Sequence, residues 1–195
     1  QMCIRDRYRG MYKYHEALTR YHSQKPSLTI NTGHRSHFHY VYNRIPTVRE
    51  SARLQSFPDD FIFYGNKSQQ YKQVGNAVPP MLGKVVAAKL KEYLRRKRLI
   101  KYKMIDLFAG CGGLTEGFMQ TGLYEEVAAV EWLKPQVNTL RKRLKEKWSE
   151  EDADDRVMHF DIQREEELFQ GWDDKEFGKG KGLDYYTSKV PKIDL

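Results

Sequence analysis

The chain has 195 residues, of which 39% are hydrophobic, and its mean hydropathy is −0.78. That length accommodates one domain with a core, or parts of two. No apolar run approaches the roughly eighteen residues of a membrane span, and no signal-peptide pattern opens the chain. The two cysteines, Cys3 and Cys111, lack the spacing of a disulfide framework or a zinc site. We therefore expect an intracellular, cytoplasmic protein that binds no metal and no membrane.

The net charge of +8 is unevenly distributed along the chain. Residues 1–103 carry 21 Lys and Arg against 6 Asp and Glu, whereas residues 104–195 carry 13 against 20. Basic segments supply salt-dependent affinity for phosphates that is largely independent of nucleotide sequence. The first half is therefore expected to bind nucleic acid. The alternative is a basic surface that is only solvated and binds no polyanion.

The beginning of the chain shows weak strand signals and one clear helix signal. Because the chain starts with Gln1, we expect a fragment whose first residues lie outside the fold. Residues 27–30 form a short β-like run, and residues 31–33 are typical of a turn. Thr47 can cap a helix that extends to residue 54, and Glu50 completes a capping box.

A second helix is predicted after a break at residues 57–60 and a loop. It begins at residues 78–80, where proline suits the first helical turn, and ends in the basic run 95–98. Its apolar residues recur every fourth position and are expected to pack on a sheet: Leu82, Val86, Leu90 and Leu94.

From residue 103 onwards, strand and helix patterns alternate. Strands are predicted at 104–108, 126–130 and 156–160, with a fourth beginning at 192–195. Helices are predicted at 114–121 and from Pro135, where one face carries Val137, Leu140, Leu144 and Trp148. An acidic loop is expected at 149–155 and a flexible loop at 171–189. This alternation predicts an α/β, Rossmann-like fold whose parallel sheet binds ligands at the carboxyl ends of its strands.

Three successive strand ends carry residues suited to a nucleoside. The glycines of residues 110–113 let the backbone approach a ligand at the start of a helix. Glu131 can accept hydrogen bonds from ribose hydroxyls, and Asp161 can read an adenine amino group. Thr115 replaces the third glycine of a dinucleotide fingerprint. The pattern favours a nucleoside site, with a structural turn as the alternative.

Two sets of motifs resemble the DNA (cytosine-5) methyltransferase family. Residues 106–114, Asp-Leu-Phe-Ala-Gly-Cys-Gly-Gly-Leu, are similar to its opening motif. Residues 44–59 resemble the ninth motif, residues 73–80 (Gln-Val-Gly-Asn-Ala-Val-Pro-Pro) the tenth, and residues 25–30 the end of the target-recognition region. The resemblance implies methyl transfer from S-adenosylmethionine to C5 of cytosine in duplex DNA, in a bacterial or phage restriction-modification system.

The resemblance also implies roles for individual residues. Glu131 would hold the ribose, Trp132 would stack on the adenine, and Asp161 with Ile162 would read and flank it. The rest of the cofactor site would comprise Phe108, Ala109, Gly110, Gly112, Gly113, Leu114, Asn76, Ala77 and Val78. Four residues of the ninth motif would hold the DNA-recognition region in place: Arg44, Arg49, Glu50 and Arg53.

The order of the motifs is inverted relative to the family. Residues 1–43 would end the recognition region, 44–98 would carry motifs nine and ten, 99–103 would link, and 104–195 would form the first half of the cofactor-binding domain. We predict a circularly permuted enzyme, with a fusion of two methyltransferases as the alternative.

The family's nucleophile is missing. It is the cysteine of a Pro-Cys motif, which adds as thiolate to C6 of a cytosine flipped from the duplex. No Pro-Cys pair, Glu-Asn-Val or Gln-x-Arg-x-Arg motif occurs here, and Cys111 lies in the cofactor loop. We therefore predict no catalytic residue in this chain, no methylation by the chain alone and a monomeric parent enzyme. The alternatives are a tRNA cytosine-5 methyltransferase, a non-catalytic DNA- or cofactor-binding module, and a split subunit that a complementing chain completes.

Overall fold

The computed structural model describes residues 19–33, 37–94 and 101–190. The first two segments contain β1 (Thr19–Arg20), β2 (His37–Phe38), α2 (Val48–Leu54), α3 (Lys67–Asn76) and α4 (Pro80–Tyr93). The third contains β3 (Tyr102–Asp106), α5 (Gly113–Met119), β4 (Tyr124–Glu131), α6 (Lys134–Trp148), α7 (Ala153–Arg156), β5 (Val157–His159), α8 (Glu165–Gln170), β6 (Trp172–Asp174), β7 (Gly178–Gly180) and α9 (Gly182–Thr187).

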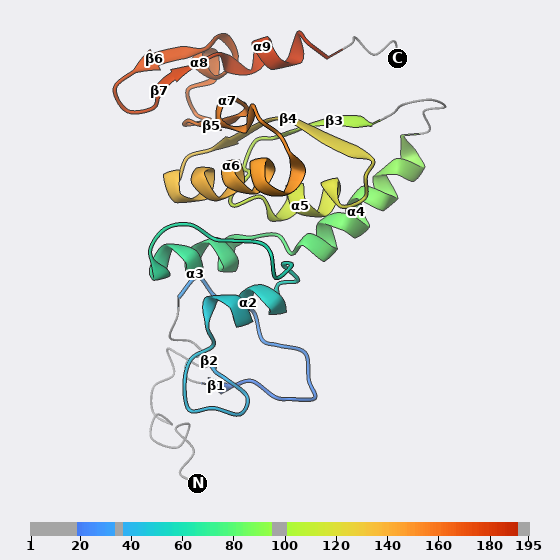
Figure 1. Cartoon of the computed structure of the whole chain (residues 1–195), viewed down its shortest axis with the longest axis vertical. Coiled ribbons are helices and arrows are strands. Elements are labelled where there is room, and N and C mark those ends of the chain that lie inside the picture. Colours follow the sequence, from blue (N-terminus) through green and yellow to red (C-terminus); the bar gives the residue numbers. More distant parts are fainter. Residues whose placement is uncertain (1–18, 34–36, 95–100, 191–195) are drawn as a thin grey trace.

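The centre of the molecule is a parallel sheet in the order β3-β4-β5. Helices α5 and α6 cover one face, and α8, α9 and the β6–β7 hairpin lie on the other (Figure 1). Helices α2 and α3 lie beyond α5 and α6, and α4 runs beside α5 (Figure 1). Parallel strands end at one edge of the sheet, so Asp106, Glu131 and His159 lie at the same edge. The predicted α/β architecture with a helix-flanked parallel sheet is confirmed.

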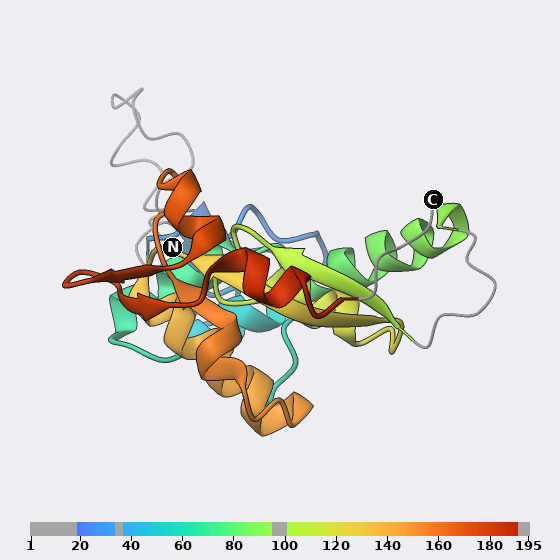
Figure 2. The ribbon, with the colours of Figure 1, turned by 90° about the horizontal axis from the view of Figure 1, so that it is seen from above.

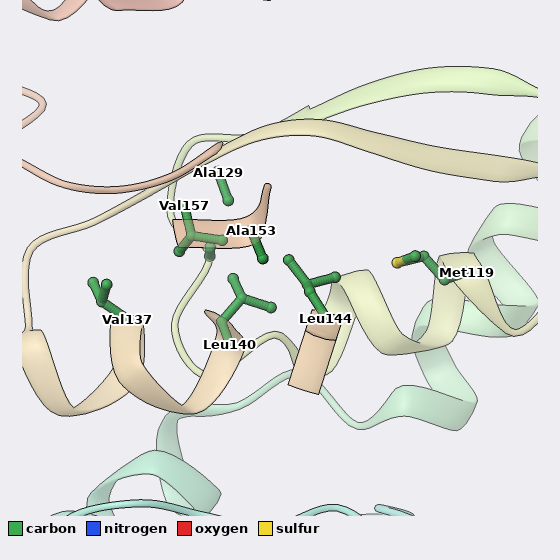
Figure 3. Close-up of a cluster of buried hydrophobic side chains, with 8 residues drawn as sticks. Met119, Ala129, Val137, Leu140, Leu144, Ala153 and Val157 are labelled. Atoms are coloured by element: carbon green, nitrogen blue, oxygen red, sulfur yellow. The ribbon is translucent and has the colours of Figure 1, made fainter. Parts of the chain in front are cut away.

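The predicted apolar face of α6 forms the core beneath the sheet. Val137, Leu140 and Leu144 are at most 1% exposed and pack against strand residues such as Ala129 and Val157 (Figure 3). Burying a side chain of this size contributes about 1.5–3 kcal/mol. The local spacing of apolar residues therefore predicted this helix and its orientation correctly.

The segment predicted as a flexible loop, residues 171–189, is instead ordered on the other face of the sheet. It forms β6, β7 and α9, and its Trp172 stacks on Phe160 with ring centroids 3.9 Å apart. A Cβ at Gly180 would lie 2.2 Å from the Trp172 ring, so this glycine makes room for the indole. Three of the four glycines of this segment, Gly171, Gly180 and Gly182, have close neighbours, so most of its glycine content reflects close packing.

Two other loop predictions were also wrong. Helix α3 lies within the expected loop before residue 78, and its Asn66 and Gln69 form a capping box. Its polar sequence shows no apolar periodicity, which is why it was missed. Part of the acidic loop forms α7. Residues 27–30 form no strand, although Ile30 is buried at 8% exposure.

Helix α4 begins as predicted, but its apolar stripe does not pack on the described sheet. Its buried residues are Pro80, Gly83 and Ala87, which face α5. A Cβ at Gly83 would lie 3.1 Å from the Leu114 carbonyl oxygen, so small residues allow the two helices to approach closely. The stripe itself is 40–53% exposed: Leu82, Val86, Leu90 and Leu94. The C-terminal half of α4 extends away from the body in both views (Figures 1 and 2).

Some expectations lie outside the described residues: the first residues of the chain, the basic run 95–98, the start of the linker at 99–100 and the strand at 192–195. Within the part that is described, no helix is long and apolar enough to cross a membrane. The same part contains no group of three or more His, Cys, Asp or Glu side chains that could hold a metal ion.

Candidate cofactor site

A pocket of about 220 Å³ lies where the ends of β3 and β4 meet the C-terminal end of α3 and the first turn of α6. Its position at the carboxyl edge of a parallel sheet is where α/β proteins bind ligands. It is lined by Gln73, Asn76, Ala77, Val78, Phe108, Ala109, Gly110, Cys111, Gly113, Leu114, Glu131, Leu133 and Gln136.

The glycine loop is shaped by close packing as well as by backbone conformation. Gly112 has φ +90°, which favours glycine, and a Cβ there would lie 2.5 Å from Leu140 Cδ1. A Cβ at Gly113 would lie 2.3 Å from the Val78 carbonyl oxygen. The loop can therefore contact α6 and residues 76–78 together only because it carries no side chains at these points.

The Glu131 carboxylate is held in place by two backbone donors. The N–H of Gly110 donates to Oε2 at 2.9 Å, and the N–H of Leu133 donates to Oε1 at 2.8 Å. Each carboxylate oxygen retains a second acceptor site. The fixed carboxylate can therefore accept hydrogen bonds from ligand hydroxyls in the pocket.

The pocket contains most of the predicted cofactor residues but not all of them. It brings together residues 76–78, most of the glycine loop and Glu131, while Gly112, Trp132, Asp161 and Ile162 do not line it. Trp132 is 63% exposed and Phe108 is 79% exposed. Asp161 follows β5, and its Oδ1 accepts the backbone N–H of Gln163 at 3.0 Å. Ile162 packs against the core on the far face of the sheet.

Residues that sequence reasoning missed include Gln73, Leu133 and Gln136. Gln136 is 6% exposed and lies four residues before Leu140 on the buried face of α6. A polar side chain at an apolar-face position is the signal that could have identified it.

Gln73 joins the first half of the chain to the second. Its Nε2 donates to the Tyr64 carbonyl oxygen at 2.7 Å, and its Oε1 accepts from Thr139 Oγ1 at 2.6 Å. The Tyr64 N–H donates to Thr139 Oγ1 at 2.9 Å. This closed set of bonds fixes α3 against α6, and so it positions residues 76–78 over the glycine loop.

A buried ion pair reinforces the same junction. Arg143 on α6 donates to both carboxylate oxygens of Glu116 on α5, at 2.7 and 2.9 Å. It also donates to the carbonyl oxygen and Oδ1 of Asp60 in the first half, both at 3.1 Å. Arg143 and Glu116 side chains are 6% and 1% exposed. Residues from both halves of the chain therefore build one packed unit around the pocket.

Cys111 is not suited to be a nucleophile. It is 2% exposed, and its Sγ donates to the Gln73 carbonyl oxygen at 3.7 Å. Burial raises the pKa of this thiol to about 12. Because the thiolate is the reactive form, Cys111 is inert near neutral pH.

The four predicted support residues bond within their own segment and do not line the pocket. Arg44 donates to both oxygens of Glu50 at 2.7 and 2.8 Å, and this bond lowers the pKa of Glu50 to about 2. Arg53 donates to both oxygens of Asp59 at 2.7 and 3.0 Å. Arg49 donates to the carbonyl oxygens of residues 58 and 61. These arginines stiffen the segment that follows Thr47, whose capping box with Glu50 is confirmed.

The chain is similar to several known proteins that are named methyltransferases. The chain is 59% identical over 68 residues to the type II methyltransferase M1.HphI of Haemophilus parahaemolyticus, covering 35% of this chain and 18% of that protein. It is 44% identical over 89 residues to the putative type II methyltransferase M.MJ0563P of Methanocaldococcus jannaschii, covering 45% and 28%. It is 46% identical over 79 residues to the DNA (cytosine-5-)-methyltransferase M.ApeKI of Aeropyrum pernix, covering 38% and 17%.

These matches span less than a third of each relative's length. A family model has wider coverage of this chain, because it matches both sets of motifs. The model for C-5 cytosine-specific DNA methylase matches residues 2–92 and 102–171, on either side of the junction between the two halves. Because this match covers most of its residues, the chain belongs to the C-5 cytosine-specific DNA methylase family.

Proposed function

We propose that this chain is the cofactor-binding and partial DNA-recognition part of a DNA (cytosine-5-)-methyltransferase of a type II restriction-modification system. The observation that carries the proposal is the pocket in which the glycine loop, Glu131 and residues 76–78 meet. The names of the relatives support the same reaction and the same biological context.

The residues present fit S-adenosylmethionine, which supplies the methyl group when bound. Glu131 accepts hydrogen bonds from the ribose hydroxyls, and its two backbone donors hold it ready to do so. Trp132, whose ring is exposed beside Glu131, would stack on the adenine. Asp161 and Ile162, which follow β5 and lie outside the pocket lining, would read and flank that ring. Phe108 and residues 76–78 would enclose the methionine end of the cofactor.

The inverted order of the motifs is best explained by circular permutation. Gln73 bonds to Thr139 and accepts from Cys111, so the tenth motif packs on α6 and on the glycine loop within one chain. A fusion of two methyltransferases would not require these two halves to complete one pocket. The joined core therefore supports the permuted arrangement.

Further polypeptide is needed to complete the active domain. Among the described residues, β3 pairs only with β4, so its other edge presents unpaired backbone groups with which a further strand can pair. The exposed stripe of α4 is apolar along 82–94. A strand added beside β3, with apolar residues facing α4, would cover both features. We infer that the part carrying the catalytic Pro-Cys motif docks there, either in the same polypeptide or as a complementing chain.

The test is methyl transfer from labelled S-adenosylmethionine to duplex DNA and to tRNA. We expect no transfer by the 195-residue chain alone, and transfer to DNA by a protein that joins it to a Pro-Cys half from the same family. Transfer to DNA by the chain alone would contradict the assignment of the nucleophile. Transfer by the joined protein to tRNA only would favour the RNA methyltransferase alternative. The cytoplasmic location and the monomeric parent remain predictions.

A further inference from the structure

The side chain of Gln136 lines the pocket and has an amide that no other residue of the described structure engages. Gln136 is 6% exposed and lies in the first turn of α6. Its backbone N–H donates to the Leu133 carbonyl oxygen at 2.9 Å, but its side-chain amide forms no hydrogen bond among the residues that the structure describes. Neither amide atom belongs to the fully buried side-chain atoms that lack a partner, so the amide is accessible where Gln136 lines the pocket, and a ligand there can pair with it.

The position of Gln136 on α6 shows which end of the pocket it faces. It lies three residues before Thr139, so the two side chains project from the same side of the helix. Thr139 donates to Gln73 of α3 at 2.6 Å. Gln136 therefore faces the C-terminal end of α3, where residues 76–78 line the pocket, and Glu131 lies toward the end of β4.

The charge of the lining limits what can bind at this end. Glu131 is the only charged side chain among the described residues that line the pocket, and it is an acid. A ligand carboxylate must therefore be bound by neutral donors. The amide of Gln73 is already used, because its Nε2 and Oε1 bond to Tyr64 and Thr139. Two side-chain amides of the lining remain available, that of Asn76, which is exposed, and that of Gln136, which is 6% exposed.

We propose that Gln136 binds the α-amino-acid group of the nucleoside cofactor, with its side-chain Nε2 donating to the carboxylate and its Oε1 available to the ammonium group. A side-chain amide supplies two N–H donors and one carbonyl acceptor, which suits a zwitterion. The inference rests on the proposed function and assigns one residue to one end of the cofactor. Glu131 takes the ribose, and Gln136 takes the group attached beyond the sulfur.

The test compares two ligands that differ only in this group. S-adenosylhomocysteine carries the amino acid, whereas 5′-methylthioadenosine has the same nucleoside and a thioether without it. Both are titrated calorimetrically into the 195-residue chain and into Gln136→Leu, which keeps a similar volume. Asn138→Leu, an exposed amide on the same helix, is the matched control. Gln136→Glu is a second variant, which keeps the shape but places a negative charge beside the carboxylate.

We expect Gln136→Leu and Gln136→Glu to lower the affinity for S-adenosylhomocysteine by about ten- to a hundredfold, the usual effect of losing a hydrogen bond to a charged group. Affinity for 5′-methylthioadenosine should stay within about twofold, and Asn138→Leu should change neither. Equal losses for both ligands, or no loss for either, would overturn the inference while leaving the proposed function intact. Failure of the unsubstituted chain to bind either ligand would overturn the proposed function itself, and the inference with it.

Discussion

Replacing Arg143 with methionine should lower the free energy of unfolding, because it removes bonds that join the two halves of the chain. Arg143 makes four hydrogen bonds, two to the Glu116 carboxylate and two to Asp60, and both members of the Arg143–Glu116 pair are almost fully buried. Removing one partner of a buried pair costs about 3–5 kcal/mol, because the other charge stays buried without compensation. Glu116 would keep two donors, Trp148 Nε1 at 3.1 Å and Gln120 Nε2 at 3.0 Å. We therefore expect Arg143→Met to lower the free energy of unfolding by about 3 kcal/mol, the lower end of that range.

The assay is urea unfolding at 25 °C, followed by circular dichroism. Lys145→Met is the control, because Lys145 on the same helix pairs with the exposed Asp154 and such surface pairs contribute at most about 1 kcal/mol. Adding Glu116→Gln to Arg143→Met should restore at least about 1 kcal/mol, since the uncompensated charge is removed. A loss below about 1 kcal/mol for Arg143→Met would refute the claim that this ion pair holds the two halves together.

Three further experiments test other parts of the structure. Burial raises the pKa of Glu126 to about 7, so the free energy of unfolding should fall by about 3 kcal/mol as pH rises from about 4.5 to 7. Glu126→Gln should remove that fall when unfolding is measured from pH 4 to 8. Gly117→Ala, whose Cβ would lie 2.3 Å from the α4 backbone, should lower the melting temperature clearly, whereas Gly33→Ala, with open space around it, should not. Replacing the exposed Leu82 and Val86 with serine should change stability by under about 1 kcal/mol and reduce binding of a hydrophobic dye.

Features encoded by neighbouring residues could be predicted from the sequence. The Thr47–Glu50 capping box depends on residues three apart, and the buried face of α6 follows from a fixed helical spacing. The glycine loop is also local, because a strand, its turn and the next helix are consecutive. The family resemblance, carried by the same local motifs, was confirmed.

Features that depend on contacts distant in sequence could not be predicted. The bond between Gln73 and Thr139 spans 66 positions, and no local pattern marks it. Trp172 orders a glycine-rich segment only because Phe160 offers it a stacking surface. The stripe of α4 was assigned to a sheet from periodicity alone, whereas the small residues Gly83 and Ala87 determine which side packs on α5. A tally of apolar positions does not account for how closely two helices can approach.

The central claim, that this chain holds S-adenosylmethionine through Glu131 and Asp161, is tested most directly by calorimetric titration of that cofactor. We predict saturable binding at one site by the unsubstituted chain. Glu131→Ala and Asp161→Ala should each weaken it by about 1–3 kcal/mol, the cost of losing a charged hydrogen-bond partner. Glu151→Ala, an exposed acid in the turn before α7, should leave the affinity unchanged. Affinity that is the same in both site variants as in the unsubstituted chain would contradict the account.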